Sequence, residues 1–213
     1  MASVKRRLFL VSLMLTVAGG AMAQEAAAPK AAPKSAPKSA KWVGPEVTLQ
    51  TTKGDIVITL DMVGAPKTAA HFLKVVQSGH YTGAAFYRIE PGFLIQLGDY
   101  DDAGRRRKAQ RPNVPLETAT NKHARGAVAL AHGDDPNTGL STFYIDLAAN
   151  EQLNAEPGAP PNTTGFAVFG HVTSGMKVVD AISKVELNPA AGIFIGKEPV
   201  VPIIVKKAVV TKE

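Results

Sequence analysis

Arg88 is the residue with the clearest chemical potential in this chain of 213 residues. A guanidinium stays charged at physiological pH and holds its N–H donors in a rigid fork, which suits it to hydrogen bonding rather than to acid–base chemistry. Arg88 stands in a β-rich stretch, residues 86–99, that turns at Pro91-Gly92. After the turn, period two predicts two faces: Phe93, Ile95 and Leu97 on one, Leu94 and Gln96 on the other. Most strand arginines are simply exposed, so this pattern alone assigns no function.

Other kinds of reactive site are poorly supported. The chain has no cysteine, which excludes disulfides, thiolate metal sites and cysteine nucleophiles. Its five histidines lack metal-ligand spacing, and neither a phosphate-binding loop nor a Gly-x-Ser-x-Gly elbow occurs. Ser141 has His132 and Asp134 nearby in sequence, but a catalytic triad is defined by geometry, which sequence proximity does not supply. We therefore expect no metal and no cofactor.

The formal net charge of +6 is concentrated at the N-terminus. Residues 1–41 hold seven basic residues and one acidic residue, which leaves 17 of each sign after Lys41. A domain without net charge lacks the positive electrostatic potential that binds the phosphates of a nucleic acid, so we expect no nucleic-acid partner. The run 105–108 is a local basic cluster that we interpret as a solvated loop, with an acidic partner left open.

The first 41 residues contain two segments that we expect to lie outside the folded domain. Residues 1–23 combine a basic start, a short apolar stretch and a small-residue end, which predicts a cleavable signal peptide cut after Ala23. Because that stretch is shorter than the 20 or so residues of a membrane span, an uncleaved anchor is the weaker alternative. Residues 24–41 repeat Ala, Pro and Lys and predict a disordered linker. We expect an exported, periplasmic protein without stable membrane insertion after cleavage.

Short strands and two helices are predicted in the domain, residues 42–213. Strands are expected at 47–51, 55–60, 86–97, 127–131, 142–147, 166–172 and 202–210, and helices from Pro66 to about Gly79 and over 176–184. Pro66 suits a first helical position, and Lys53-Gly54 is typical of a hairpin turn. Many short strands with two helices predict a mainly β fold, a closed β-barrel whose ends the helices cover.

The motifs resemble those of the cyclophilin family. FYRIEPGFLIQ at 86–96 is similar to the family signature F-H-R-V-I-P-G-F-M-I-Q. GAVALAH at 126–132, STFYI at 141–145, FAVFGHV at 166–172 and GMKVVDAI at 175–182 resemble further family segments, and APKTA at 65–69 resembles its first helix. Order and spacing agree from about Thr48 to Val210, and the arrangement is most similar to the periplasmic bacterial branch.

The resemblance implies a closed eight-stranded antiparallel β-barrel capped by two α-helices, and cis/trans isomerisation of X-Pro bonds without a cofactor. Rotation must cross a barrier of about 18–20 kcal/mol. At the twisted transition state the prolyl nitrogen regains its lone pair and accepts a hydrogen bond, which the resemblance assigns to Arg88. It also assigns a positioning role to Gln96.

A substrate surface follows from the same resemblance. It implies an apolar proline slot built by Phe93, Leu94, Tyr144, Leu153 and Phe166. Ala131 and His132 lie where the family's strand edge pairs with the peptide main chain. Without the resemblance, Phe93, Tyr144 and Phe166 are equally well explained as barrel core.

Several positions depart from the family pattern. Tyr144 replaces the usual Phe and brings a hydroxyl that needs a partner. Thr142, assigned to the substrate surface, replaces the usual Gln. Gln152 stands where animal members carry a Trp, so we expect weak cyclosporin binding. An extra residue before Ser141 and the loop 155–164 make Leu153 the least secure slot assignment.

The expected partners are proline-containing polypeptides, and we expect a monomer that assists the folding of exported proteins. A binding module or chaperone of the same fold, with little turnover, is the alternative that Thr142 and Tyr144 suggest. A third reading is an interaction protein that acts through the basic linker.

Overall fold

The computed structural model describes residues 42–108, 112–190 and 192–213. The expected signal peptide and the expected linker, residues 1–41, lie outside these residues. The elements in chain order are β1 (Glu46–Thr51), β2 (Gly54–Leu60), α1 (Pro66–Gln77), β3 (Ala84–Glu90), β4 (Leu94–Asp101), β5 (Ala127–Leu130), β6 (Phe143–Asp146), β7 (Ala167–Ser174), α2 (Met176–Ile182) and β8 (Val205–Lys212). Short 3₁₀ turns occupy Pro136–Thr138 and Glu151–Leu153.

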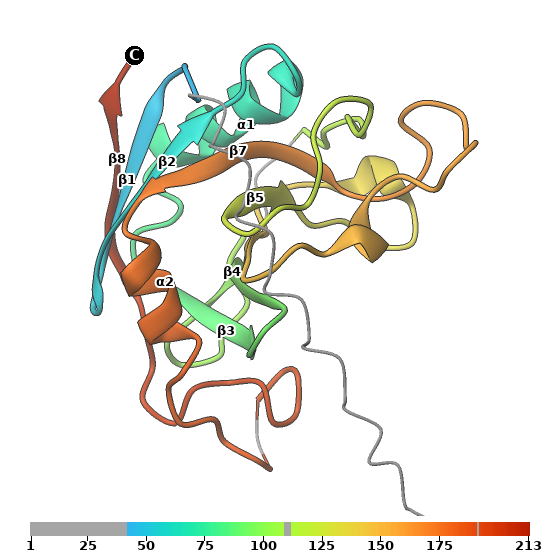
Figure 1. Cartoon of the computed structure of the whole chain (residues 1–213). Helices are drawn as coiled ribbons and strands as arrows, with labels where there is room; N and C mark the ends of the chain where they lie inside the picture. The colour runs from blue at the N-terminus through green and yellow to red at the C-terminus, as the bar shows by residue number, and fades with distance from the viewer. Residues whose placement is uncertain (1–41, 109–111, 191) are drawn as a thin grey trace, which may run out of the picture. The chain divides into compact units, whose positions relative to one another are not determined.

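All eight strands belong to one antiparallel sheet in the order β3-β4-β6-β5-β7-β2-β1-β8, which curls strongly (Figure 1). Its two edge strands meet without a full ladder. Gly83 N donates to Val205 O at 2.7 Å, Phe86 N donates to Ile203 O at 2.9 Å, and a single bridge pairs Ala85 with Ile204. The expected mainly β barrel is confirmed, but it is less completely closed than expected, because its two edge strands pair only in part.

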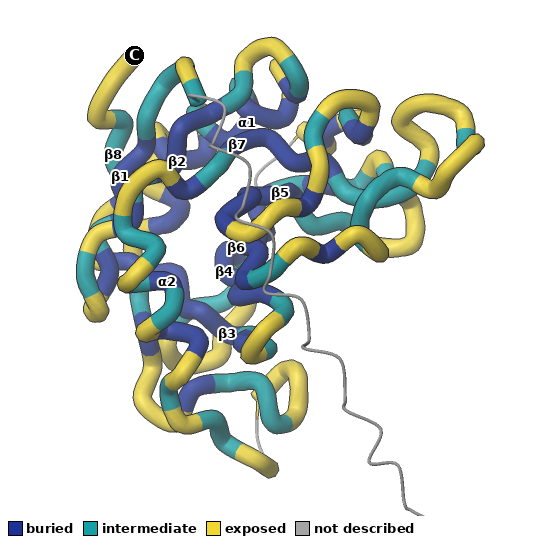
Figure 2. Tube along the Cα trace, viewed as in Figure 1, coloured by how far each residue is buried: buried dark blue, intermediate teal, exposed yellow. Residues whose placement is uncertain are grey.

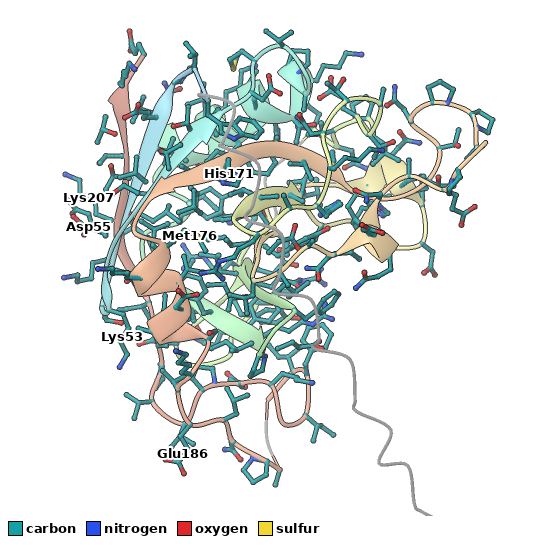
Figure 3. All side chains as sticks on the ribbon, viewed as in Figure 1. Lys53, Asp55, His171, Met176, Glu186 and Lys207 are labelled. Carbon is teal, nitrogen blue, oxygen red and sulfur yellow. The ribbon has the colours of Figure 1, made fainter. Side chains whose placement is uncertain are left out.

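The β1–β2 hairpin turns at the expected place. Thr51 lies opposite Gly54, whose φ of 124° is a conformation that favours glycine. The side chains of Lys53 and Asp55 at this turn, and of Lys207 on the neighbouring β8, extend outward from the sheet (Figure 3). Ile56 and Ile58, which alternate with them, are fully buried. The polar side of these strands therefore faces water and the apolar side forms core.

One apolar core fills the inside of the curled sheet, and Figure 2 shows the buried backbone concentrated in the strands. Phe72 of α1 packs against Phe143 and Phe169 of the sheet at ring-centroid distances of 5.2 and 4.9 Å. The other helix, α2, contacts β2 and buries Val179 and Ile182. Within the described residues, no helix has both the length and the apolarity needed to cross a membrane.

The start of α1 takes its polar partner from a distant loop. Pro66 occupies the first turn, and no residue of the helix caps the free N–H groups with its side chain. The Glu117 carboxylate accepts hydrogen bonds from two of these groups instead, Lys67 N at 3.2 Å and Thr68 N at 2.8 Å. A carboxylate at a helix N-terminus also matches the helix dipole. The predicted helix from Pro66 is confirmed, and it ends at Gln77, just before the expected stop at Gly79.

Candidate functional site

A β-bulge aims the reactive side chains at the outer face of the sheet. Between β3 and β4, Phe86 pairs with Leu97 but Arg88 pairs with Gln96, so the register shifts and Tyr87 is the extra residue. Bulges bend a strand and redirect its side chains. Tyr87 and Arg88 consequently both bond to Gln96, at 2.7 Å and 3.0 Å. The sequence predicted Arg88 and Gln96 here, but not Tyr87.

Arg88 is held on its edges by two neighbours. Its Nε donates to Glu90 Oε1 at 2.8 Å and its Nη2 lies 2.6 Å from the same oxygen. Its Nη1 donates to Gln96 Oε1 at 3.0 Å. These bonds use three of the five N–H groups of a guanidinium, and the other two have no partner among the described residues. With the side chain 25% exposed, a bound peptide can reach them.

Gln96 connects Arg88 to Tyr87. Since a guanidinium offers only donors, the Gln96 carbonyl must face Arg88, and its amide N–H then faces the Tyr87 hydroxyl. Burial raises the pKa of Tyr87 above its usual value, and the charge of Asp99 adds to this, while the hydrogen bond from Gln96 opposes it. The Tyr87 phenol therefore stays neutral and adds no negative charge beside Arg88.

Glu90 is the counter-ion of Arg88, and it stands where the family signature has an isoleucine. Partial burial favours its neutral form, but the hydrogen bond and charge of Arg88, helped by Lys197, lower the pKa of Glu90 below its usual value. Lys197 Nζ lies 3.5 Å from Glu90 Oε2. The sequence analysis did not assign a role to Glu90, although its position two residues after Arg88 on one strand was a usable signal.

An aromatic ring from a distant segment covers the guanidinium. The Arg88 Cζ lies 5.1 Å from the ring centroid of Phe194, within the range of a cation–π contact. The Phe194 ring also stacks on Tyr87, with centroids 6.0 Å apart and planes 17° apart. Phe194 lies in the loop between α2 and β8, more than 100 positions from Arg88, so sequence reasoning had no local signal for it.

The predicted proline slot forms one apolar cluster beside these groups. Tyr144 pairs directly with Gln96 across β4 and β6, which joins the cluster to the arginine. Leu94 and Tyr144 are buried, and around them pack the partly buried residues Phe93, Ala131, Leu153 and Phe166. The structure thus brings together every predicted slot residue, including Leu153, the assignment that the loop lengths made least secure.

Phe93 corrects one detail of the sequence pattern. Period two placed it with Ile95 and Leu97, which do lie in the barrel core. Phe93 instead packs with Leu94 in the outer cluster, because β4 begins only at Leu94 and Phe93 belongs to the preceding turn. Its N–H bonds Glu90 O at 2.9 Å within that turn. Strand alternation does not extend to a turn residue.

Aromatic contacts shape the walls of the slot. Phe166 meets Tyr144 edge to face at a ring-centroid distance of 5.9 Å. His132 stacks on the Phe166 ring with centroids 4.3 Å apart. The Tyr144 hydroxyl is buried and has no hydrogen-bond partner in the described part of the chain, so the partner expected from the sequence is not found. Burial also raises the pKa of Tyr144 well above its usual value, so the hydroxyl stays protonated.

A hollow of about 400 Å³ adjoins the slot. The predicted residues Gln96, Ala131, His132 and Thr142 line it, together with Tyr87 and Phe194. Ala131 N already donates to Thr142 O at 2.9 Å. Main-chain pairing with a peptide at this edge, as predicted, is therefore left to the Ala131 carbonyl and to His132.

A buried polar network supports the slot from behind, and sequence reasoning missed it. Asp146, at the end of β6, accepts from Asn150 Nδ2 at 2.7 Å and lies 2.8 Å from His123 Nδ1. Asn150 also donates to Phe93 O at 2.9 Å, and His123 Nε2 lies 3.3 Å from Phe166 O. The network thus holds the main chain of two slot walls. Among the described residues, no group of three or more His, Asp and Glu side chains is arranged to hold a metal ion.

A curled eight-stranded antiparallel sheet with a partly apolar hollow on its outer face defines a class of β-barrel proteins. The cyclophilin type peptidyl-prolyl cis-trans isomerase family model matches residues 46–210, and the chain belongs to this family. It is therefore a cyclophilin-type peptidyl-prolyl cis-trans isomerase, as its motifs predicted.

Named relatives agree with this assignment. A peptidyl-prolyl cis-trans isomerase of Streptomyces antibioticus is 35% identical over 165 residues, covering 76% of this chain and 96% of its own length. Peptidyl-prolyl cis-trans isomerase A of Dickeya dadantii is 32% identical, covering 78% of this chain and 85% of its own. Among solved structures, a Cryptosporidium parvum cyclophilin crystallised in the presence of the dipeptide Ala-Pro has a TM-score of 0.62 at 24% identity, covering 79% of this chain and 99% of its own, which supports the fold.

Proposed function

We propose that this isomerase accelerates X-Pro rotation in exported polypeptides by aiming the two unpaired N–H groups of Arg88 at the substrate. One would donate to the prolyl nitrogen as the amide twists, and the other would help to hold the adjoining carbonyl. The planar amide nitrogen is a poor acceptor because its lone pair is delocalised. The bond therefore strengthens only at the transition state, which is the condition for lowering the barrier.

The restrained position of Arg88 is the observation that carries the proposal. A free arginine would lose side-chain entropy on binding, whereas here Glu90 and Gln96 already fix its edges. The apolar cluster beside it offers the substrate proline a ring-sized surface of Phe93, Leu94 and Phe166. The Ala-Pro dipeptide present with the Cryptosporidium parvum relative is a ligand of the expected kind.

The site of action is inferred from the sequence of residues 1–41. A cleavable signal peptide and a linker would deliver the domain to the periplasm, where unfolded exported chains carry slowly isomerising X-Pro bonds. Expression of the full chain in a Gram-negative host should yield a periplasmic protein whose N-terminal residue is Gln24. Retention in the cytoplasm at full mass would contradict this part of the proposal.

The catalytic proposal is tested with a short X-Pro peptide and NMR exchange spectroscopy. The domain should accelerate isomerisation, and Arg88→Ala should reduce kcat/KM by about a hundredfold or more, the range found when a preorganised donor is removed. The matched control is Arg125→Ala, since Arg125 pairs with Asp180 at 2.7 Å on the surface. Equal rates for the wild type and Arg88→Ala would overturn the mechanism, and peptide binding without acceleration by the wild type would indicate a binding module.

A further inference from the structure

The loop 186–200, of which the structure describes residues 186–190 and 192–200, lies between α2 and β8 and places Phe194 against Arg88. Its two arms are tied at the base, where Asn188 N donates to Glu198 O at 2.8 Å and Val200 N donates to Glu186 O at 2.9 Å. Next to this base the returning arm is attached to β3, since Ile89 N donates to Lys197 O at 2.7 Å. Figure 1 shows this orange-red loop next to the end of the sheet that carries β3. The loop is therefore closed at its base and bonded to β3 beside that base.

This fastening determines where Phe194 lies. Lys197 N donates to Phe194 O at 2.9 Å, so a turn links the ring to the residue bonded to β3. From this turn the Phe194 ring reaches both Arg88, at 5.1 Å from Cζ, and Tyr87, at 6.0 Å between ring centroids. The Phe194 side chain is 40% exposed, so burial in the apolar core does not account for its position. Its contacts with Arg88 and Tyr87 give it a definite place.

The same turn reaches the counter-ion of the arginine. Lys197 Nζ lies 3.5 Å from Glu90 Oε2, while Glu90 Oε1 holds Arg88. One loop therefore contacts the guanidinium face and, through Glu90, its edge. Edge bonds alone allow a planar group to tilt about the line that joins them. A ring on one face restricts that tilt.

We propose that Phe194 is a positioning residue for the isomerase reaction, which fixes the tilt of the Arg88 guanidinium through its aromatic face. The inference rests on the proposed function, because it takes Arg88 as the donor to the twisting amide. One of the two unpaired N–H groups must point at a nitrogen that pyramidalises by a small displacement, and the other at the adjoining carbonyl. Since misplacement by about 1 Å can cost a hundredfold in rate, a restraint on tilt bears directly on turnover.

A simpler role for Phe194 makes a different prediction. Phe194 and Ile193 line the hollow of about 400 Å³, and the simpler role is that of an apolar wall for the peptide. A wall contributes equally to ground-state and transition-state binding, and its loss raises KM at constant kcat. A positioning residue acts in the transition state, and its loss lowers kcat.

The experiment compares three variants of Phe194 in the whole chain. Phe194→Ala and Phe194→Leu should each lower kcat about three- to tenfold, because neither presents a π face, whereas Phe194→Tyr should stay within about twofold of the wild type. Ile195→Ala, which changes a neighbour that is 74% exposed, is the control and should leave kcat unchanged. The Arg88 Nε–H resonance in a ¹H–¹⁵N spectrum should shift in Phe194→Ala and Phe194→Leu as the ring current is lost.

The outcomes separate this inference from the proposed function. If Arg88→Ala is as active as the wild type, the proposed function itself fails. If Arg88→Ala is inactive but Phe194→Leu retains the wild-type kcat with only KM raised, Phe194 is a wall and the inference is overturned. An unchanged Arg88 Nε–H resonance in both Phe194→Ala and Phe194→Leu would also overturn it, whatever their rates.

Discussion

At the scale of single residues, the site is a set of restraints around one cation. Gln96 has only one orientation that satisfies both Arg88 and Tyr87, and Glu90 remains ionised because Arg88 and Lys197 lower its pKa. No group in this set needs to change protonation during catalysis. This arrangement is consistent with the proposed mechanism, in which preorganised hydrogen bonds act without reorganisation at the moment of reaction.

The buried hydroxyl of Tyr144 has no hydrogen-bond partner within the described residues, and neither has that of Thr142. Leaving such a group unpaired costs about 1–3 kcal/mol. Tyr144→Phe should therefore raise the free energy of unfolding by about 1 kcal/mol or more, measured by urea denaturation. Peptide isomerisation should be retained, because the slot keeps its aromatic wall.

A second tyrosine provides the matched control for Tyr144. The Tyr81 hydroxyl, equally buried, donates to Ser141 O at 2.9 Å. Tyr81→Phe removes that bond and should lower the free energy of unfolding by about 1 kcal/mol. Opposite signs for the two substitutions are expected. If Tyr144→Phe were destabilising by the same amount as Tyr81→Phe, the Tyr144 hydroxyl would have to be bonded in solution.

At the scale of elements, periodicity and turn residues predicted the strands and helices well, because these are local signals. The hairpin at Lys53-Gly54, the helix from Pro66 and the helix from Met176 were all found. Phe93 was placed on the wrong face by period two, since a tertiary feature, the start of β4, decides where alternation begins. The family resemblance grouped Phe93 with Leu94 and Tyr144, and the structure places it in that cluster.

Features that depend on contacts between distant segments had no sequence signal. Phe194 reaches Arg88 only because the loop 186–200 is bonded to β3. The bulge at Tyr87 depends on how β3 and β4 pair, which a single strand does not reveal. The candidate site was therefore predictable where it lies within motifs and not where tertiary packing completes it.

The network behind the slot allows a test at this scale. Asp146 is fully buried and is the acceptor for both His123 and Asn150, so Asp146→Ala leaves two buried polar side chains without their partner. Each buried polar group left without its partner costs about 1–3 kcal/mol, and two groups are affected here. We expect a loss of that order in urea denaturation, and weaker peptide binding because Phe93 and Phe166 lose main-chain support.

Asp180→Ala is the matched control for Asp146. It removes the same kind of side chain from an ion pair with Arg125 at 2.7 Å, but the two side chains are 47% and 36% exposed. Exposed pairs contribute about 0–1 kcal/mol. If the two substitutions cost the same, the buried network would not be a support of the fold.

At the scale of the whole molecule, the barrel keeps the apolar core that stabilises the fold apart from the candidate site. The large core lies inside the curled sheet, and the smaller cluster that includes Tyr144 lies on its outer face. Strand alternation makes this possible, because β4 gives Ile95 and Leu97 to the core, and Leu94 and Gln96 to the site. A groove built on strands is held by the full sheet, which suits a site that must keep a guanidinium in one orientation.

Three histidines distributed over the molecule give its stability a defined pH dependence. Burial lowers the pKa of His71, His80 and His171 below the usual 6.5, and the charges of Lys74 and Arg107 lower it further at His71 and His80. Each is thus neutral in the folded state at a pH where the unfolded chain already binds a proton. Unfolding then takes up protons, so the free energy of unfolding must fall as the pH drops below about 6.5.

We expect urea denaturation to show this fall between pH 7.5 and pH 5.5. The carboxylates with lowered pKa, among them Asp61 and Glu90, do not contribute in this window, since their usual values are 3.8 and 4.5. His171 stacks on Trp42 at 5.3 Å, and His171→Phe keeps an aromatic ring there while removing one titrating group. That variant should lose part of the pH dependence between 7.5 and 5.5. A stability that stays constant over this range in the wild type would contradict the assignment of neutral histidines at these three positions.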